Sequence, residues 1–294
     1  MIRFSKYLWL YALISLFVLV PGVYSLVRYG LRPGIDFTGG TLLELSFGKT
    51  LPEETIRSSL ERSGIPFVGF QTSGTSVLVR IKPEGSESVL QFQKEIERSA
   101  SVAATVDRNE TVGPILGSEL LVKATFAAIL AILVILAYVA YAFRNIKFGI
   151  SAVIALIHDL LVVLGVFSLL GHMYAVEVDT LFVTAFLTTM SFSVHDTIVV
   201  FDRIREYRKK DDKTSFEQLS DRALTETMGR SLTNSLTIIF MLLALILLGG
   251  ETIKWFIVAL LVGTVSGTYS SPFIATPVLL LCDRWEKRRV KSGK

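Results

Sequence analysis

The first candidate for chemistry is a carboxylate inside an apolar helix. Asp196 lies next to His195 within residues 181–206. A membrane span needs about 20 helical residues, and the uncharged stretch 181–194 supplies 14, so the span must continue to about Phe201. An ionised carboxylate at the centre of a span costs on the order of 2.5 to 3.5 kcal/mol, and chains keep one there mainly to meet a partner, a cavity or a proton path. Proton transfer is therefore the first chemistry that the sequence indicates.

Other titratable side chains fall inside predicted spans. Asp159 lies near the centre of the preceding span, where a structural hydrogen bond and a functional role are equally supported. Its neighbour His158 is expected to be a packing residue. His195 could relay protons because its pKa lies near physiological pH, but a bond to a carbonyl is favoured. Arg230 lies at the boundary of a later span, where snorkelling to lipid headgroups is slightly favoured over pairing with a buried acid.

The elements that must position these residues are membrane helices. The mean hydropathy is +0.54, and 51% of the 294 residues are hydrophobic. A retained first helix is favoured over a signal peptide, because the apolar run from Leu8 to about Leu26 exceeds a signal h-region of about 7 to 15 residues. We predict six spans, over residues 8–26, 120–143, 148–170, 181–201, 229–248 and 255–281.

Basic residues predict the orientation of these spans. Segments 1–7, 144–147, 202–229 and 283–294 hold 2, 2, 7 and 6 Lys or Arg, whereas 171–180 and 249–254 hold 0 and 1. Short cytoplasmic loops are enriched in Lys and Arg. We therefore expect cytoplasmic termini, with an N-terminal segment over residues 1–28, a bundle 120–282 that includes the cytoplasmic loop 202–229, and a basic tail 283–294.

Residues 29–119 predict a soluble domain on the opposite, periplasmic side. They contain 9 basic and 12 acidic residues and no run long enough to span. Strand-like segments alternate with helical ones, and Thr72, Ser73, Gly74 and Thr75 separate two strands as in a hairpin. The order β-α-β-β-α-β indicates a small ferredoxin-like α+β domain.

Glycine-containing segments flank this domain, and each is either a tight turn or a hinge. Gly39 and Gly40 allow positive φ. The segments are Gly34, Ile35, Asp36, Phe37, Thr38, Gly39 and Gly40 before the domain, and Val112, Gly113 and Pro114 after it. In the last span, Gly263 and Gly267 predict a close helix contact, and Pro272 and Pro277 predict a bend.

Several function classes are excluded by the composition and the motifs. One cysteine, Cys282, cannot form an intrachain disulfide. No metal-ligand spacing and no nucleophile motif is evident, so neither an enzyme nor a metal site is expected. Gly48, Lys49 and Thr50 end like a phosphate-binding loop, but Leu43 stands where its first glycine belongs. The net charge of +4 follows the topology signals and does not indicate nucleic acid.

The ordered motifs resemble the SecF family of bacterial protein-export membrane proteins. The signature is Ser193, Val194, His195, Asp196, Thr197, Ile198, Val199, Val200, Phe201, Asp202, Arg203, Ile204, Arg205 and Glu206. The glycine segments and the pair His158 and Asp159 match in order, and the resemblance covers essentially the whole chain. One departure is His195, where the family usually has Asn, so the details of proton coupling are less secure than the family.

The resemblance implies a role in protein transport. The family belongs to the resistance-nodulation-division superfamily, in which two six-helix halves surround proton-carrying acids. Expected partners are SecD, the SecYEG translocon, YajC and the translocating preprotein in the bacterial inner membrane. The coupling ion would be the proton or, alternatively, sodium, with no other cofactor. Asp196 matches the proton-linked acid, and Arg230 a basic residue associated with it.

Two other functions stay open at this point. The chain could be a structural subunit whose polar residues only join helices. It could also be a half-size exporter of small molecules, although the soluble domain of only about 90 residues shows no apolar binding groove.

Overall fold

The protein has six helical stretches that are long and apolar enough to cross a membrane. The computed structural model describes residues 4–64, 67–81, 86–143, 145–211 and 213–291. Within these ranges the stretches are Phe4–Tyr29, Ile115–Val139, Ile146–Tyr174, Thr180–Lys210, Phe216–Leu248 and Ile253–Arg288. The six predicted spans are confirmed, and the chain is a multi-pass membrane protein.

The chain divides into two compact units. The helical unit consists of Met1–Arg32, Ala127–Val176 and Leu181–Lys294, and the second unit of Pro33–Phe126 and Glu177–Thr180. The sequence places residues 177–180 between two spans of the bundle. They join the second unit because the backbone N–H of Gly34 donates to the carbonyl of Val178 over 2.7 Å.

The second unit contains the predicted small α+β domain. Its elements follow the order α2 (Ile35–Thr38), β1 (Gly40–Ser46), α3 (Glu53–Ser63), β2 (Phe67–Ser73), β3 (Ser76–Ile81), α4 (Ser86–Ala100) and β4 (Thr105–Val112). The sheet is antiparallel with strand order β2-β3-β1-β4. The β-α-β-β-α-β order is confirmed, and the hairpin turns at Gly74, whose φ is +58°. The short helix α2 lies where the sequence indicates only a turn or hinge.

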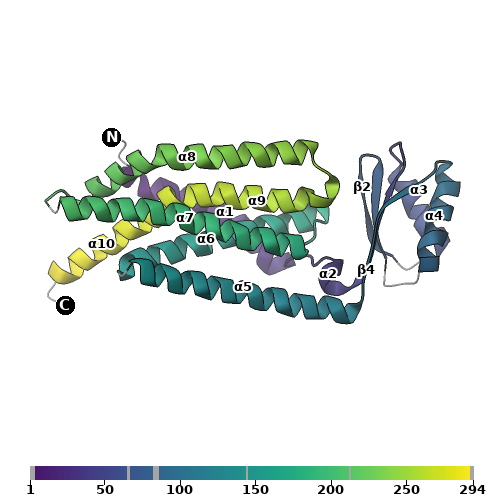
Figure 1. The fold of residues 1–294 in the computed structure, drawn as a ribbon, viewed down its shortest axis with the longest axis horizontal. Helices are drawn as coiled ribbons and strands as arrows, with labels where there is room; N and C mark the ends of the chain where they lie inside the picture. Colours follow the sequence, from purple (N-terminus) through teal and green to yellow (C-terminus); the bar gives the residue numbers. More distant parts are fainter. Residues whose placement is uncertain (1–3, 65–66, 82–85, 144, 212, 292–294) are drawn as a thin grey trace. The chain divides into compact units, whose positions relative to one another are not determined.

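One face of the sheet is covered by α3 and α4 (Figure 1). Alternate residues of a strand point to the same face, and Leu43 and Leu45 of β1 are fully buried there. They pack in one core with Ile56 of α3 and Phe92 of α4. This unit therefore has a hydrophobic interior of its own.

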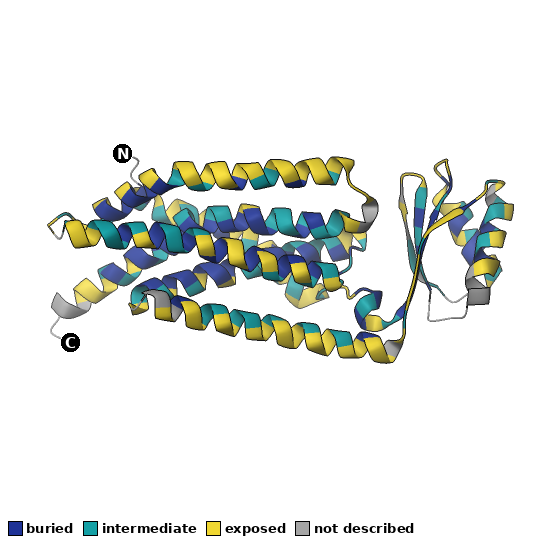
Figure 2. Ribbon diagram, viewed as in Figure 1, coloured by how far each residue is buried: buried dark blue, intermediate teal, exposed yellow. Residues whose placement is uncertain are grey.

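The helical unit is built from long helices. They are η1 (Phe4–Tyr7), α1 (Leu8–Tyr29), α5 (Pro114–Phe143, from Ala127 onward), α6 (Ile146–Tyr174), α7 (Thr180–Lys210), α8 (Phe216–Leu248), α9 (Glu251–Ser270), η2 (Ser271–Ala275) and α10 (Thr276–Lys291). Figure 2 shows that α6 and α7 contain many buried positions, whereas α8 is largely exposed along its second half. Because exposed apolar side chains suit contact with lipid, α6 and α7 form the interior of this unit.

Glycine brings α1 and α6 into backbone contact. A Cβ placed on Gly165 of α6 would lie 2.7 Å from the Cα of Gly22 in α1. Nearby, the hydroxyls of Ser25 and Ser168 are 2.8 Å apart. Small residues permit such close helix contacts in membranes, so these positions fix α1 against α6.

The last span changes its helical geometry at Pro272. The segment η2, which contains this proline, is a π-helix between α9 and α10. Proline has no backbone N–H to donate to the preceding turn, and π-helical turns accommodate such interruptions. Figure 1 shows α10 leaving the direction of α9, in agreement with the predicted bend.

The predicted cytoplasmic loop 202–229 is mostly helical, which corrects the sequence interpretation. Helix α7 continues to Lys210 and α8 begins at Phe216. Arg203 forms ion pairs with Glu206 and Glu226, so one side chain joins the two extensions. Charged residues at helix-compatible spacing stabilise helices beyond the apolar run, and they explain the difference.

The short connection between α7 and α8 is held by side-chain hydrogen bonds. Asp211 accepts hydrogen bonds from the hydroxyl and the backbone N–H of Thr214. These bonds, that of the hydroxyl first, hold the pKa of Asp211 below its usual range. The side chain of Ser215 then caps α8 by accepting from the N–H of Gln218 over 3.3 Å.

Candidate functional site

The most enclosed carboxylate of the described spans belongs to Asp159 on α6, which is 5% exposed. Its Oδ1 accepts a hydrogen bond from Ser266 (2.6 Å) and lies 3.0 Å from Nδ1 of His158. Its Oδ2 accepts from Ser193 (2.5 Å) and Ser270 (2.6 Å). A carboxylate can accept about four hydrogen bonds, so the acceptor positions of ionised Asp159 are filled.

Close helix packing delivers these serines to Asp159. A Cβ on Gly267 would lie 3.1 Å from the Cα of Ser193, and one on Gly263 would lie 2.3 Å from the Cγ2 of Thr189. The predicted contact surface at Gly263 and Gly267 is thereby confirmed, with α7 as the neighbour. It brings the serine-bearing turns of α9 and α7 to the same carboxylate.

Asp196 has a more open environment on α7. It is half-buried, and its Oδ2 accepts a hydrogen bond from Ser231 of α8 over 2.6 Å. Ser193, one turn earlier on α7, binds Asp159 instead. A single turn of α7 therefore connects the two carboxylates, one on the α6 and α9 side and one on the α8 side.

The two predicted basic partners of Asp196 lie apart from it. Arg230 and His195 are both exposed, and neither forms a hydrogen bond or ion pair within the described residues. Snorkelling of Arg230, which the sequence favours slightly, fits this placement. The stripe predicted on α7 is also divided, because Thr189, Ser193 and Val200 are buried but Phe192 is 40% exposed.

Polar side chains continue along the exposed surface of α7 and α8. The exposed polar residues at helical spacing are Thr184, Thr188, Ser191 and His195 on α7, and Arg230, Thr233, Asn234 and Thr237 on α8. Threonines can satisfy their hydroxyls on the preceding turn of their own helix, as Thr188, Thr233 and Thr237 do. The arginine, histidine and asparagine side chains have no such local solution.

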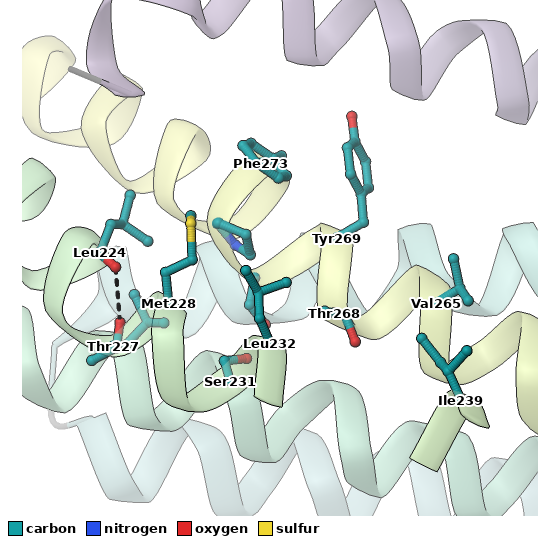
Figure 3. A pocket seen from close by; sticks show the side chains of 13 residues that line it. Leu224, Thr227, Met228, Ser231, Leu232, Ile239, Val265, Thr268, Tyr269 and Phe273 are labelled. Atoms are coloured by element: carbon teal, nitrogen blue, oxygen red, sulfur yellow. Dashed lines mark hydrogen bonds between the residues drawn. The ribbon is translucent and has the colours of Figure 1, made fainter. Parts of the chain in front are cut away.

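A cavity of about 270 Å³ lies beside Ser231. Figure 3 shows its lining from α8, including Met228 and Leu232, facing Tyr269 and Phe273 of the last span. The lining is predominantly apolar, and apolar cavities of this kind stay free of water. It therefore leaves space next to the bond between Ser231 and Asp196.

The glycine segment before the domain binds the start of α7. Asp36 Oδ2 accepts hydrogen bonds from the N–H (3.0 Å) and the hydroxyl (2.6 Å) of Thr180, the first residue of that helix. Gly39 and Gly40 have φ values of +73° and +142°. Both values favour glycine. This segment is thus a shaped contact with the connector 177–180.

The second glycine segment has fewer constraints. The carbonyl of Gly113 accepts from the N–H of Gly117 over 2.9 Å, and α5 begins at Pro114. A Cβ on Gly113 would meet nothing within 4 Å, whereas one on Gly117 would lie 2.8 Å from the N atom of Gly39. The glycine required by close contact is therefore Gly117, which the sequence motifs do not single out.

Ser231, Ser266 and Ser270 are partners of the carboxylates that sequence reasoning misses. Ser266 and Ser270 are four residues apart and lie next to Gly263 and Gly267. Hydroxyls one helical turn apart beside small residues are a signal for a polar contact between helices. Asp179 and Thr180 likewise precede an apolar run, as helix-capping residues do.

Two family models match this sequence. Residues 91–285 match the model described as protein export membrane protein SecD/SecF, C-terminal, and residues 24–50 match the SecD/SecF GG motif. The chain belongs to the SecF family of protein translocase subunits. Members of the SecF family are transport proteins and not enzymes, so the exclusion of enzymatic activity is confirmed.

Relatives match over nearly the full SecF-family chain. The protein translocase subunit SecF of Thermobaculum terrenum is 44% identical over 300 residues, which cover 95% of this chain and 93% of the relative. That of Vibrio alginolyticus is 37% identical, covering 95% and 88%.

Solved SecDF structures share the fold of this SecF-family chain. The crystal structure of SecDF, a translocon-associated membrane protein from Thermus thermophilus, matches with a TM-score of 0.85 and 33% identity, covering 97% of this chain and 39% of that chain. SecDF in a super-membrane-facing form gives a TM-score of 0.73 and 31% identity, covering 100% and 40%. This chain thus spans about two-fifths of the length of those proteins.

Proposed function

We propose that this chain pairs with a SecD subunit and uses the proton-motive force to promote late protein translocation across the bacterial cytoplasmic membrane. In this proposal the termini are cytoplasmic, the unit containing the β-sheet is periplasmic, and the SecYEG translocon, YajC and a preprotein are the further partners. The distribution of basic residues supports the orientation. The SecDF structures, which are longer than this chain, support a SecD partner.

The observation that carries the proposal is the exposed polar surface of α7 and α8. His195, Arg230 and Asn234 lie in membrane-spanning helices without a local partner among the described residues. Exposure of such groups to lipid is costly, so they face protein or a hydrated cavity. A second helical half covering this surface would place Asp196 and Arg230 between the two halves.

The proton-coupling step follows from Asp196. Protonation removes its charge, and the resulting carboxylic acid interacts differently with Ser231. The change can shift α8 against α7, because a ligand that binds one arrangement better shifts the population toward it. His195 and Asp159 are placed in the same path, with Asp159 reached through the turn of α7 that carries Ser193.

A route along the chain connects this path to the periplasmic unit. Asp36 holds the first residue of α7, the helix on which Asp196 lies. The segment with Gly34, Gly39 and Gly40 and the junction at Gly113 and Pro114 then act as the hinges of the domain. A shift of α7 would reach the domain through these contacts.

The test is preprotein translocation into inverted membrane vesicles, with and without a proton-motive force. Asp196→Asn is expected to remove the proton-dependent stage and to leave the ATP-driven stage intact. Asp202→Asn on the same helix is the matched control, because Asp202 is exposed and contacts only Arg205 in its own helix. Full proton-dependent translocation by Asp196→Asn at equal complex abundance would contradict the proposal.

A second function, assembly of the translocon without proton coupling, is favoured by the saturated surroundings of Asp159. Four partners on its carboxylate join α6, α7 and α9 as polar contacts do in membranes. This alternative predicts that Asp196→Asn lowers complex yield and translocation in proportion. The proton-coupling proposal predicts normal yield with loss of one stage.

A further inference from the structure

His158 has one ring nitrogen that the protein does not satisfy. The residue is 6% exposed, and its Nε2 has no hydrogen-bond partner within the described residues. Its Nδ1 lies 3.0 Å from Asp159 Oδ1. A carboxylate only accepts hydrogen bonds, so Nδ1 carries the hydrogen and Nε2 presents a lone pair.

Neighbouring side chains leave this lone pair available. The ring of Tyr269 on α9 lies 6.3 Å from the ring of His158, centroid to centroid. The hydroxyl of Tyr269 donates to the backbone carbonyl of Tyr11 on α1, so its hydrogen is already used. Phe273 of η2 packs on the same tyrosine and offers no hydrogen.

Charged groups are distant from Nε2 in sequence along α6. The ion pair between Lys147 and Asp283 of α10 lies eleven residues earlier on this helix, about 16 Å along its axis. On the α7 side the nearby polar groups are Ser193, which binds Asp159, and Asp196, which binds Ser231. The titratable neighbours of His158 are therefore Asp159 on its own helix and the two tyrosines.

We propose that His158 binds a water molecule at Nε2 and relays protons between that water and Asp159. Buried polar atoms are nearly always paired with protein or ordered water, and here no protein atom is available among the described residues. The inference rests on the proposed proton coupling and adds a proton route to Asp159 that does not pass through Asp196.

The relay is balanced in both directions. A proton passes from the water file to Nε2, the bond between Nδ1 and its hydrogen breaks, and a bond between that hydrogen and Asp159 Oδ1 forms. The imidazole stays neutral and changes tautomer. Release reverses each step, returning one proton to Nδ1 and one to water.

Protonation of Asp159 alters the contacts of α9. Oδ1 accepts from both Ser266 and His158 in the ionised state. Once it carries a hydrogen it becomes a donor and loses acceptor capacity. The helix that presents Ser266 and Ser270 is then held less firmly to α6, which gives the relay a structural consequence.

The experiment uses the complete complex in inverted vesicles and compares His158→Gln with His172→Gln. Glutamine can still donate to Asp159 but cannot pass a proton through a ring. His172 lies on the same helix, is exposed and stacks on Tyr29. His158→Gln is expected to slow the proton-dependent stage on the order of tenfold or more and to flatten its pH profile, because positioned proton transfer contributes roughly 10² to 10⁴-fold. His172→Gln is expected to match the unsubstituted complex.

The outcomes separate the relay from the proton-coupling proposal. A rate and pH profile equal to those of the unsubstituted complex in His158→Gln would overturn the relay alone, if Asp196→Asn still removes the proton-dependent stage. Full proton-dependent translocation by both Asp196→Asn and Asp159→Asn would overturn the proton-coupling proposal and the relay with it.

A second measurement does not depend on a His158 variant. The chain has three histidines, so the double substitution of His172 and His195 by glutamine leaves His158 as the single ¹⁵N-histidine reporter. We expect an Nε2 signal typical of a nitrogen hydrogen-bonded to water that exchanges with deuterium oxide. A signal typical of a free nitrogen, unchanged by deuterium oxide and by pH, would refute the relay.

Discussion

Asp159 and Asp196 are the same residue type in neighbouring helices, but their hydrogen bonding differs. Asp159 is buried with four partners, whereas Asp196 is half-buried with the single hydroxyl of Ser231. A buried group that loses a partner costs more than one that water or a neighbouring chain can reach. The first residue therefore carries more stability, and the second is freer to change its charge.

Replacement of each acid by asparagine tests this difference. Asp159→Asn leaves serine donors facing an amide nitrogen that cannot accept, so we expect a loss of about 1 to 3 kcal/mol. Asp196→Asn keeps an oxygen for Ser231 and is expected to cost less than about 1 kcal/mol. Thermal unfolding of the purified complex in one detergent measures both. Equal midpoints for the two variants would contradict the assignment of the stabilising role to Asp159.

At the scale of helices, two glycines decide how closely α1 and α6 approach. A Cβ on Gly165 would fall within 2.7 Å of the backbone of Gly22, and backbone cannot rotate away as a side chain can. The serine pair beside it depends on the same spacing. The close contact is thus a property of two helices and of no single hydrogen bond.

Gly165→Ala is expected to destabilise the protein by about 1 to 3 kcal/mol through overpacking. Gly149→Ala on the same helix is the matched control, because a Cβ there would meet nothing within 4 Å. Alanine is favoured over glycine within helices by roughly 0.5 to 1 kcal/mol, so the control is expected to be neutral or stabilising. Thermal midpoints measure both, and an unchanged midpoint in Gly165→Ala would refute the backbone contact.

The start of α7 depends on a side chain from far along the chain. Asp36 accepts from the N–H of Thr180, so Asp36→Ala is expected to cost about 0.5 to 2 kcal/mol, as other helix caps do. Hydrogen exchange at the amide of Thr180 is the measurement, and exchange is expected to accelerate. Asp36→Asn, which retains an acceptor oxygen, should stay close to the unsubstituted protein. No acceleration in Asp36→Ala would show that the cap contributes nothing to this helix end.

At the scale of the whole chain, the two units have separate interiors and distinct surfaces. The sheet unit buries its apolar residues between β-strands and helices, whereas α8 exposes both apolar and polar residues. The polar region, with Asn234 and Arg230, is the portion of this surface that lipid does not suit.

Spin labels test whether a partner covers this surface. In a Cys282→Ser background, a label at Asn234→Cys is expected to lose collisional access to oxygen when SecD is present. A label at Val134→Cys on α5, whose side chain is 59% exposed and apolar, serves as the comparison. We expect its access to stay the same with and without SecD. Unchanged access at position 234 would argue that the partner binds elsewhere.

The sequence predicts those features that depend on local pattern. Long apolar runs locate all six spans, and alternation with turn residues locates the strands and the hairpin at Gly74. Pairs distant in the chain escape it: nothing near Asp159 indicates Ser266, and nothing near Asp36 indicates Thr180. The extensions of α7 and α8 also escape it, since ion pairs such as that of Arg203 with Glu226 form only after both helices are in place.

The cluster at Asp159 has a consequence for biosynthesis. Ser266 and Ser270 follow Asp159 by 107 and 111 residues, so α6 is made well before these hydroxyls exist. At about 5 to 20 residues per second, the delay is roughly 5 to 20 s. During that time the carboxylate enters the membrane with half of its final partners absent, at an insertion cost on the order of 2.5 to 3.5 kcal/mol. The nascent helix must therefore wait in a polar setting, beside the insertion machinery or water, until the last span arrives.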